Sequence, residues 1–288
     1  INRYDRLTET SKALPVYSEW YYGPQIRNLI SYKYTATKLP GYFSDLMVTS
    51  SFQDIEESRI SRKYNTTSKD FRFERVNVLG VNADLLHKQS NGEIHLGAES
   101  YTNFVRSTAE RLNIATSALS RITTRYSDGP TKMSYNALYL QQTKQLDAHW
   151  VLNDGIRLNI VQLDARFADT TLMHFPFNRA IQNNTAVTGN LGIAYNGENG
   201  YRATAGLSSG FRSPNVDDLT KVFDTKTGYV VVPNKDLKPE YTYNAEINLS
   251  HTGNIASWGA SVFYTWFNNA IVVSKYNWNG QDNIMYQN

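Results

Sequence analysis

Alternation of apolar and polar side chains is the feature that most constrains the fold of this chain. From 201 to 211 the odd positions are Tyr, Ala, Ala, Leu, Ser and Phe, and from 202 to 212 the even positions are Arg, Thr, Gly, Ser, Gly and Arg. Successive side chains of a β-strand point to opposite faces, so this period of two predicts a strand with one apolar and one polar face. The same alternation recurs at 81–85, 185–195, 241–249 and 256–266.

Composition indicates where such strands can lie. Mean hydropathy is −0.49 although the chain holds 20 Tyr, 12 Phe and 5 Trp, and no run approaches the roughly 18 apolar residues of a membrane helix. Transmembrane barrels alternate lipid-facing and lumen-facing residues and carry aromatic girdles at both interfaces. We therefore predict an all-β chain that forms an antiparallel up-and-down transmembrane β-barrel, with a soluble β-sandwich as a less favoured alternative.

Several classes of function find no support in the sequence. The net charge of +3 is small and the basic residues are scattered, so we expect no nucleic-acid partner. With no Cys there are no disulfides or thiolate ligands, and the five His residues show no HExxH spacing. Nucleophile elbows and phosphate loops are also missing. We expect no enzyme activity, no bound metal and no cofactor.

Turn signals divide the chain into short and long connections. Short turn signals with Gly, Asn or Pro stand at 39–41, 90–92, 153–155, 196–200 and 252–254. Longer polar stretches lie between them, at 54–72, 105–132, 168–184 and 212–239. Outer-membrane barrels combine tight periplasmic turns with long extracellular loops, so the short turns are expected at the periplasmic end.

The alternation slips once, after residue 160. Ile156, Leu158 and Ile160 share one parity, whereas Val161, Leu163, Ala165 and Phe167 share the other. Either a one-residue β-bulge restores both sets to one face, or the strand leaves the membrane at this point and its outer face no longer needs to be apolar.

Two sequence boxes near the C-terminal end carry a family resemblance. GFRSPN at 210–215 and VPNKDLKPE at 232–240 resemble the FRAP and NPDL boxes of TonB-dependent outer-membrane receptors. RYDRLTET at 3–10, SEWYYGPQ at 18–25 and SYNALYLQQTKQL at 134–146 are similar to barrel segments of the same family, as its Bacteroidetes members write them. The family-motif residues are Phe211, Arg212, Ser213, Pro214, Asn234, Asp236, Leu237, Pro239 and Glu240.

The resemblance implies an architecture and a role. Residues 1–288 would form about ten strands, roughly half of a 22-stranded plugged barrel. The plug domain and the other strands would lie outside this sequence, because a half barrel leaves open edges that lipid cannot satisfy. The family imports scarce substrates such as ferric siderophores or other metal chelates across the outer membrane of Gram-negative bacteria. Its implied partners are the TonB complex acting through the plug, a small-molecule chelate, outer-membrane lipid and lipopolysaccharide, and a surface lipoprotein. The alternative is a passive or structural barrel, such as a porin, an adhesin or part of a secretion or surface-assembly complex.

The long connections hold the candidate ligand-binding residues. Arg106, Arg121, Arg125 and Arg212 would supply positive charge to an anionic chelate. The alternative for the stretch 106–125 is a solvated loop that meets lipopolysaccharide or nothing. His174, Phe175 and Tyr229 would supply coordinating or stacking groups. Haem receptors of the family usually carry a His between the two boxes, and residues 215–233 contain none, which argues against haem ligation there.

The boxes themselves depart slightly from the family pattern. Ser213 replaces the usual Ala and Lys235 the usual Pro, and we interpret the boxes as shaping the base of a loop. The acids Asp217 and Asp218 are predicted to lie in the first turn of a short helix capped by Ser213 or Asn215, with Pro214 at its first position, in preference to a metal or acid–base site.

Overall fold

The chain is almost entirely β-structure. The computed structural model describes residues 4–5, 10–11, 16–169, 171–172, 177–221, 231–278 and 280–288. Over these residues the helices are η1 (Glu198–Gly200) and α1 (Val216–Thr220), so the prediction of no helix longer than two turns is confirmed for that part of the chain. No helix there is long and apolar enough to cross a membrane.

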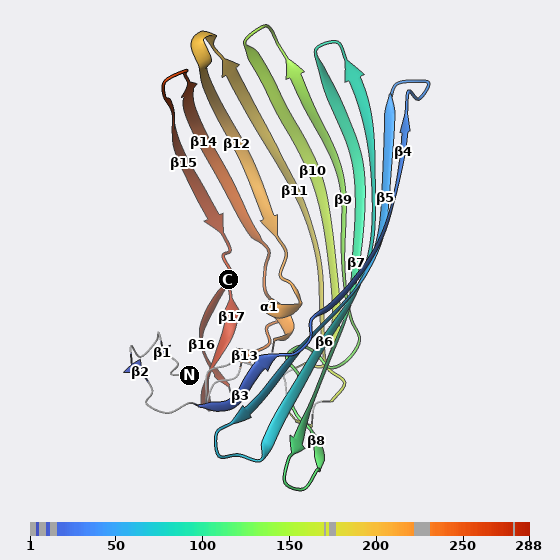
Figure 1. The fold of residues 1–288 in the computed structure, drawn as a ribbon, viewed down its shortest axis with the longest axis vertical. Coiled ribbons are helices and arrows are strands. Elements are labelled where there is room, and N and C mark those ends of the chain that lie inside the picture. Colours follow the sequence, from blue (N-terminus) through green and yellow to red (C-terminus); the bar gives the residue numbers. More distant parts are fainter. Residues whose placement is uncertain are drawn as a thin grey trace.

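The main sheet is antiparallel and follows sequence order (Figure 1). Over the described residues it has 12 strands, in the order β15-β14-β12-β11-β10-β9-β7-β6-β5-β3, with β4 also paired to β5 and β8 to β7. This is the up-and-down arrangement predicted, as an open curved sheet. Its strands are β3 (Tyr17–Tyr22), β4 (Ile26–Thr37), β5 (Asp45–Lys63), β6 (Ser68–Gln89), β7 (Gly92–Asn113), β8 (Leu119–Arg121), β9 (Thr131–Gln145), β10 (Trp150–Arg166), β11 (Arg179–Asn196), β12 (Tyr201–Arg212), β14 (Glu240–Thr252) and β15 (Ser257–Asn268).

Two smaller sheets lie beside it. β13 (Val231–Val232) runs parallel to β17 (Gln281–Gln287), which pairs with β16 (Val272–Trp278). β1 (Tyr4–Asp5) pairs with β2 (Thr10–Ser11). Within 3–10, predicted as a barrel segment, the described residues pair locally and not with the main sheet. The segments predicted at 18–25 and 134–146 do contribute to it, as β3 and β9.

Four of the five short turns are where the sequence places them. Those at 39–41, 90–92, 196–200 and 252–254 all lie at one end of the sheet, the upper end in Figure 1. The turn predicted at 153–155 is wrong, because these residues pair on both sides within β10. The reversal occurs at 146–149 instead, where Asp147 Oδ1 accepts the backbone N–H groups of His149 and Trp150. Pairing with two neighbouring strands overrides the local turn preference of Asn-Asp-Gly.

The long connections lie at the opposite end, and their predicted bounds need correction. No long loop spans 54–72: β5 and β6 run through it and reverse at 64–67. β7 likewise extends to Asn113, and β11 begins at Arg179. The 22 residues of β6 extend about 70 Å at roughly 3.3 Å per residue, whereas about 9–11 residues cross a membrane. The polar composition of these stretches predicts loops because the strand ends project beyond the apolar band, where neither face has to be continuously apolar.

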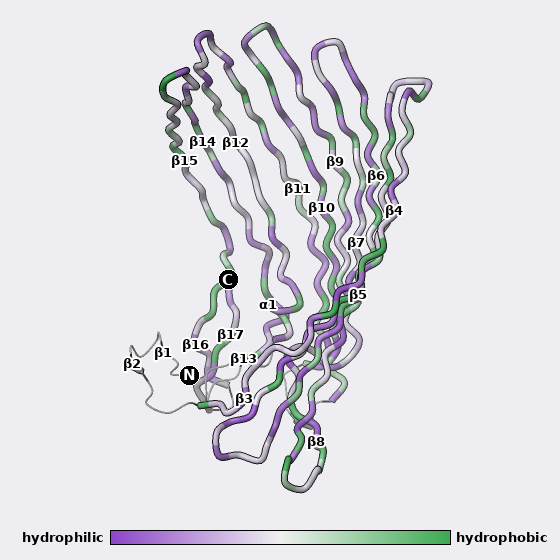
Figure 2. Tube along the Cα trace, in the orientation of Figure 1, coloured by the Kyte–Doolittle hydropathy of each residue, from purple (hydrophilic) through white to green (hydrophobic). Residues whose placement is uncertain are grey.

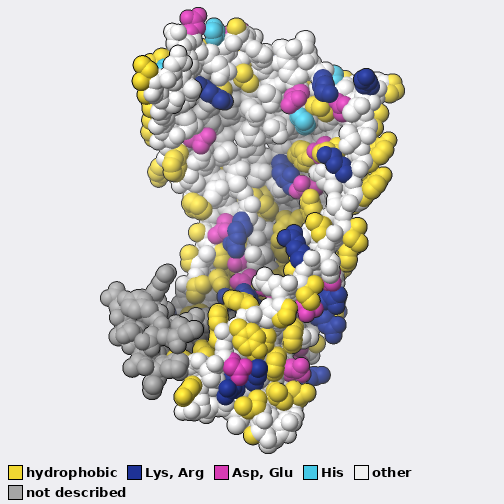
Figure 3. Space-filling model, in the orientation of Figure 1, with side chains coloured by type: hydrophobic (Ala, Val, Ile, Leu, Met, Phe, Trp, Pro, Cys, Tyr) yellow, Lys and Arg dark blue, Asp and Glu magenta, His cyan; other side chains and the backbone are white. Residues whose placement is uncertain are grey.

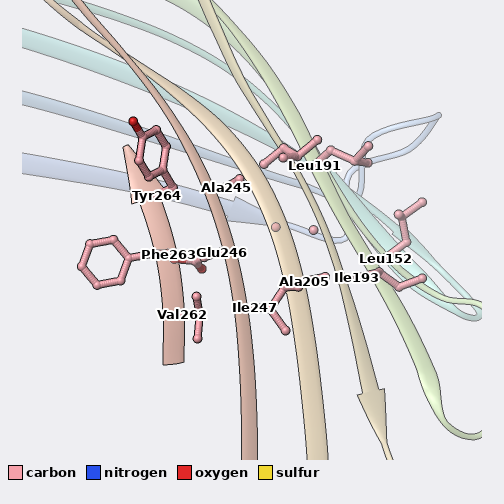
Figure 4. A pocket seen from close by; sticks show the side chains of 13 residues that line it. Leu152, Leu191, Ile193, Ala205, Ala245, Glu246, Ile247, Val262, Phe263 and Tyr264 are labelled. Carbon is pink, nitrogen blue, oxygen red and sulfur yellow. The ribbon is translucent and has the colours of Figure 1, made fainter. Parts of the chain in front are cut away.

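The two faces of the sheet differ as the alternation predicts. Hydropathy alternates residue by residue along the strands in Figure 2. Figure 3 looks onto a hollowed face, largely free of hydrophobic side chains in its upper half, with hydrophobic groups crowding the lateral edges. On the apolar face, small Ala205 and Ala245 leave a groove of about 710 Å³ between larger side chains (Figure 4). Those larger groups include Leu191, Ile247 and Val262, each more than half exposed in this chain.

Aromatic side chains bound the apolar face. Near the short turns, the rings of Trp150 and Tyr195 lie 4.9 Å apart and those of Tyr201 and Trp258 lie 6.4 Å apart. Further along β15, Trp266 shares the face of Trp258. The spacing of eight residues from Trp258 to Trp266 corresponds to about 27 Å at roughly 3.4 Å per residue. This length is close to the roughly 25 Å apolar band of outer-membrane barrels. The lipid band therefore occupies the half of the sheet that carries the short turns.

The slip in β10 is not a bulge. β10 pairs with β9 and β11 in an unbroken register, so Ile156 and Ile160 face outward while Val161, Leu163 and Ala165 face inward. The three inward residues are at most 5% exposed, because they pack against the segment between β12 and β14. Along β10, apolar side chains occupy the outer face within the lipid band and the inner face beyond it. The change occurs because the inner face beyond the band packs against a protein core.

Candidate functional site

The FRAP-like box at 210–215 and the NPDL-like box at 232–240 meet at the end of the sheet opposite the short turns. Arg212, the last residue of β12, forms ion pairs with Asp218 Oδ2 at 2.6 Å and with Glu240 Oε2 at 2.7 Å. Glu240 begins β14 and also accepts the backbone N–H of Ile271 at 2.6 Å. One guanidinium therefore joins the end of one strand, the helix and the start of the next strand.

Helix α1 begins with a capping box. Asn215 Oδ1 accepts the N–H of Asp218 at 3.0 Å, and Asp218 Oδ2 accepts the N–H of Asn215 at 2.9 Å. Of the two caps predicted, Asn215 is correct, and both acids lie in the first turn as expected. Pro214 is not the first helical residue, because it precedes the cap and is fully buried. Asp218 is committed to the cap and to Arg212.

Side chains on the inner face of β11 form hydrogen bonds to both boxes. Gln182 Nε2, on the inner face of β11, donates to the backbone carbonyls of Lys235 at 3.1 Å and Leu237 at 2.7 Å. Asn184 Nδ2, two residues along, donates to Ser213 Oγ at 2.9 Å. The hydroxyl of Ser213 makes this contact, which the usual Ala could not. β11 pairs with β12 only from Asn190 onward, and these side chains bind the boxes where the strands separate.

A hydrophobic core lies beneath the boxes. Leu219 and Leu237 pack with Val216 against Met133 of β9 and Leu163 of β10, and each of the five is at most 9% exposed. Burying a side chain of this size contributes roughly 1.5–3 kcal/mol. The boxes are thus anchored to the inner wall by apolar contacts as well as by hydrogen bonds. Asn234 adds a bond to the Tyr286 carbonyl at 2.9 Å, and its Oδ1 accepts the N–H of Asp236.

The charges of this site are stabilised by their partners. Burial raises the pKa of Glu240, but the Ile271 N–H and the Arg212 guanidinium outweigh burial and hold the pKa below its ordinary value. Burial likewise lowers the pKa of Arg212, and its two carboxylate partners more than restore it. Both groups are therefore ionised at neutral pH, and the pair persists across the physiological range.

A second segment, residues 122–130, folds inward onto α1. Arg125 Nη2 lies 3.2 Å from Asp217 Oδ1, and its guanidinium stacks 4.9 Å from the centre of the Tyr126 ring. The backbone N–H of Ser127, which is 1% exposed, points to Thr220 Oγ1 at 3.4 Å. Burial, with the nearby charge of Asp217, raises the pKa of Tyr126, so the phenol stays neutral. Loop and helix together cover the inner wall at this end of the sheet, which we call the mouth.

The structure brings together two of the four candidate arginines. Arg125 and Arg212 both bind acids of α1. Arg121 lies on β8 with its side chain 83% exposed and 3.5 Å from Asp169. Arg106 is opposite Arg75 on the outer face of β7, away from the mouth. His174, Phe175 and Tyr229 lie outside the described residues.

Sequence reasoning missed the polar side chains of the inner wall. Tyr139 donates to Asp84, and Arg157 pairs with Glu99, so these residues link β6, β7, β9 and β10 across the inner face. Gln182 was missed for the same reason. The sequence does contain a signal for these residues. Each of them alternates with the apolar positions of its strand and therefore lies on the opposite face. Parity identifies an inner-facing residue but not the partner it meets.

Comparison with known proteins agrees with this geometry. Residues 3–288 match the family model described as "TonB dependent receptor-like, beta-barrel". The chain belongs to the TonB-dependent receptor family. This match covers nearly the whole sequence, including both boxes, and the family consists of outer-membrane transport receptors of Gram-negative bacteria. A comparison with curated protein sequences found no match.

Solved structures of TonB-dependent receptors share the fold. The copper transporter OprC superposes with a TM-score of 0.76 at 13% identity, over 93% of this chain and 42% of that protein. The hemophore receptor HasR of Serratia marcescens, a double mutant in complex with its hemophore HasA and heme, gives 0.72 at 14% identity, over 93% and 44%. The ferric yersiniabactin uptake receptor FyuA from Yersinia pestis gives 0.55 at 16% identity, over 86% and 38%. The chain therefore spans less than half the length of these receptors.

Proposed function

We propose that this chain is part of the barrel of an outer-membrane receptor that takes up a metal chelate, such as a ferric siderophore, in a TonB-dependent way. The observation that carries the proposal is the joining of the two boxes by Arg212 at the mouth. A passive pore needs an open lumen, whereas this mouth is lined by an inward-folded loop and a packed core. Such a covered mouth is suited to binding a scarce solute before it is transported.

The binding surface is proposed to be the mouth-facing part of residues 114–130, 167–178 and 213–239. Long connections on a rigid sheet can vary without disturbing strand pairing, and specificity commonly resides there. Arg121 is largely exposed, and the one ion pair that it forms within the described residues, with Asp169, is long. It therefore remains available to an anionic chelate that approaches residues 114–130 and 167–178. His174, Phe175 and Tyr229 stay candidates within the same segments.

The metal-chelate class is inferred from the family and from these groups together. Names of structural neighbours refer to copper, heme and a ferric siderophore, so metal-bearing substrates recur among proteins of this fold. An exposed guanidinium suits an anionic chelate. The metal would arrive as cargo, and the chain would hold no resident metal or cofactor.

Import would further require a plug and the TonB complex, which we propose act through sequence outside residues 1–288. The apolar outer face would contact outer-membrane lipid, and the exposed charges at the mouth would meet lipopolysaccharide or a surface lipoprotein. The two edges of the sheet, β15 and the β3–β4 side, would pair with further strands to close the barrel.

The proposal is tested by uptake of radioactive iron in cells that carry the receptor with its native flanking sequence. A panel of ferric catecholates and ferric hydroxamates serves as probe. We expect one class to be taken up only when TonB is present, and Arg121→Ala to reduce that uptake about tenfold, as expected for one lost charge-assisted contact. Arg106→Ala is the matched control, because this arginine lies within β7 opposite Arg75 and forms no ion pair within the described residues. Equal, TonB-independent entry of small unrelated solutes would instead indicate a porin.

A further inference from the structure

Two glutamates face each other on the inner wall near the mouth. Glu57 of β5 and Glu74 of β6 are directly opposite in the antiparallel register, on the face that looks into the barrel. Glu74 is only 6% exposed. Ser107 Oγ lies 3.5 Å from its Oε1, and its Oε2 has no hydrogen-bond partner. A buried carboxylate oxygen without a donor is strongly disfavoured in the ionised form.

The neighbouring charged groups are largely engaged elsewhere. Those that face Glu74 are Glu57 and Arg59 on β5, Asp70 and Arg72 on β6, Arg111 on β7, Arg125 and Tyr126 on the inward loop, and Asp217 on α1. Asp70 pairs with Arg72 at 3.6 Å and with Arg111 at 2.6 Å. Arg125 pairs with Asp217, and Arg59 lies over the ring of Tyr22. Neither carboxyl group forms an ion pair within the described residues, although Arg59 and Arg72 lie in the adjacent row of the inner face.

Two carboxylates directly opposite each other cannot both ionise at low cost, so the buried one, Glu74, binds a proton more readily. Burial, followed by the negative charge of Glu57, raises the pKa of Glu74 to about 7, although Arg72 and Ser107 partly oppose the rise. A divalent cation is the other way to neutralise such a pair. Hard cations seek six or more oxygen ligands, and no cluster of three acidic or His side chains occurs in the described part of the chain. The guanidinium groups of Arg59 and Arg72, two positions along the same face, also repel a cation.

We propose that Glu74, opposite Glu57 in the wall of the mouth, is a proton-binding site that gains and loses its proton around neutral pH and that supports the inward-folded loop. The backbone N–H of Tyr126 points to Ser107 Oγ at 3.5 Å, and the Ser107 hydroxyl points to Glu74, so the loop rests on Glu74 through one side chain. Loss of the proton places two adjacent carboxylates beneath Tyr126. Water must then enter, and residues 122–128 lift from the wall. This inference does not depend on the substrate proposed above.

The proton is observed directly by infrared spectroscopy of the purified receptor, titrated from about pH 5 to about pH 9. The wild type is expected to show a protonated-carboxyl band that disappears with a midpoint near pH 7. Glu74→Gln mimics the neutral acid and should lack this band. Glu57→Gln removes the like charge and should shift the midpoint to lower pH. Glu56→Gln, which changes the outward-facing neighbour, should leave the midpoint unchanged.

Two outcomes would overturn the proposal. One is a wild-type spectrum without a carboxyl group titrating near neutrality, or a band that persists in Glu74→Gln. The other is loss of the neutral-pH band on addition of calcium, which would identify a cation site. The loop is followed separately by a nitroxide on Thr123→Cys. Its mobility should rise with pH in the wild type and stay low in Glu74→Gln, and a pH-independent signal in both would refute the seating of the loop.

Discussion

Arg212 is predicted to hold the mouth together, and Arg212→Ala tests this. The substitution removes one charge-assisted bond to Asp218, which is 6% exposed, and another to Glu240. Hydrogen bonds to charged groups contribute about 1.5–3 kcal/mol each. Because the Arg212 side chain is 43% exposed, we take about 1–1.5 kcal/mol for each bond. The expected loss of local stability is therefore about 2–3 kcal/mol.

Amide hydrogen exchange of the receptor in lipid nanodiscs measures this loss locally. A change of 2–3 kcal/mol corresponds to exchange about 30- to 150-fold faster in α1 and in residues 235–240. The strands β9 and β10 should keep their protection, because their ladder does not involve Arg212.

Arg202→Ala is the matched control for this experiment. Arg202 lies on the same strand and the same face as Arg212, at the short-turn end, and forms no ion pair within the described residues. Equal effects of the two substitutions, or faster exchange across the whole sheet in Arg212→Ala, would refute the bridging role of Arg212.

Three further outcomes follow from the same structure. Leu163→Ala should lower the free energy of unfolding in lipid vesicles by about 2–4 kcal/mol. Leu207→Ala, on the lipid face, should lower it by less than about 1 kcal/mol. Equal losses would contradict the inward direction of Leu163. Gly200 has φ of +78°, and a Cβ there would collide with the carbonyl of Thr252 on the neighbouring strand β14. Gly41 has φ of +113° but open space around it. Gly200→Ala should therefore lower the refolding yield more than Gly41→Ala does. The pKa of Glu240 is depressed in the fold, so its contribution to stability is complete above about pH 4.5 and is lost as pH falls below this value. Proteolysis at the mouth should accelerate there in the wild type, with no such pH step in Glu240→Gln.

The alternation in the sequence was sufficient for the fold class. Side chains of a strand alternate by local geometry alone, so residues 201–211 and 241–249 already separate an apolar from a polar face. Most turns were also predictable, because Gly and Asn supply backbone conformations that other residues avoid. The cap at Asn215 is likewise local, since it involves residues three positions apart.

Tertiary structure decided where segments with the composition of a turn or a loop form strands instead. Asn153 to Gly155 has the composition of a turn, yet pairing on both sides keeps it in the middle of β10. Residues 54–72 have the composition of a loop, yet they extend two long strands, β5 and β6, beyond the lipid. In both cases backbone hydrogen bonds to neighbouring strands outweighed the local preference.

The candidate site depended most on contacts between distant parts of the chain. The sequence identified Arg125 and Arg212, but only the fold joins both to α1 and leaves Arg106 on the other face. The opposition of Glu57 and Glu74 depends on the register of β5 and β6, since a shift of one residue would send one of them outward. The sequence by itself determined which residues can share a face, because that follows from a repeat of two along one strand. Which residues meet across that face was decided by the tertiary structure, because register and inward folding are set by many weak contacts that no single segment contains.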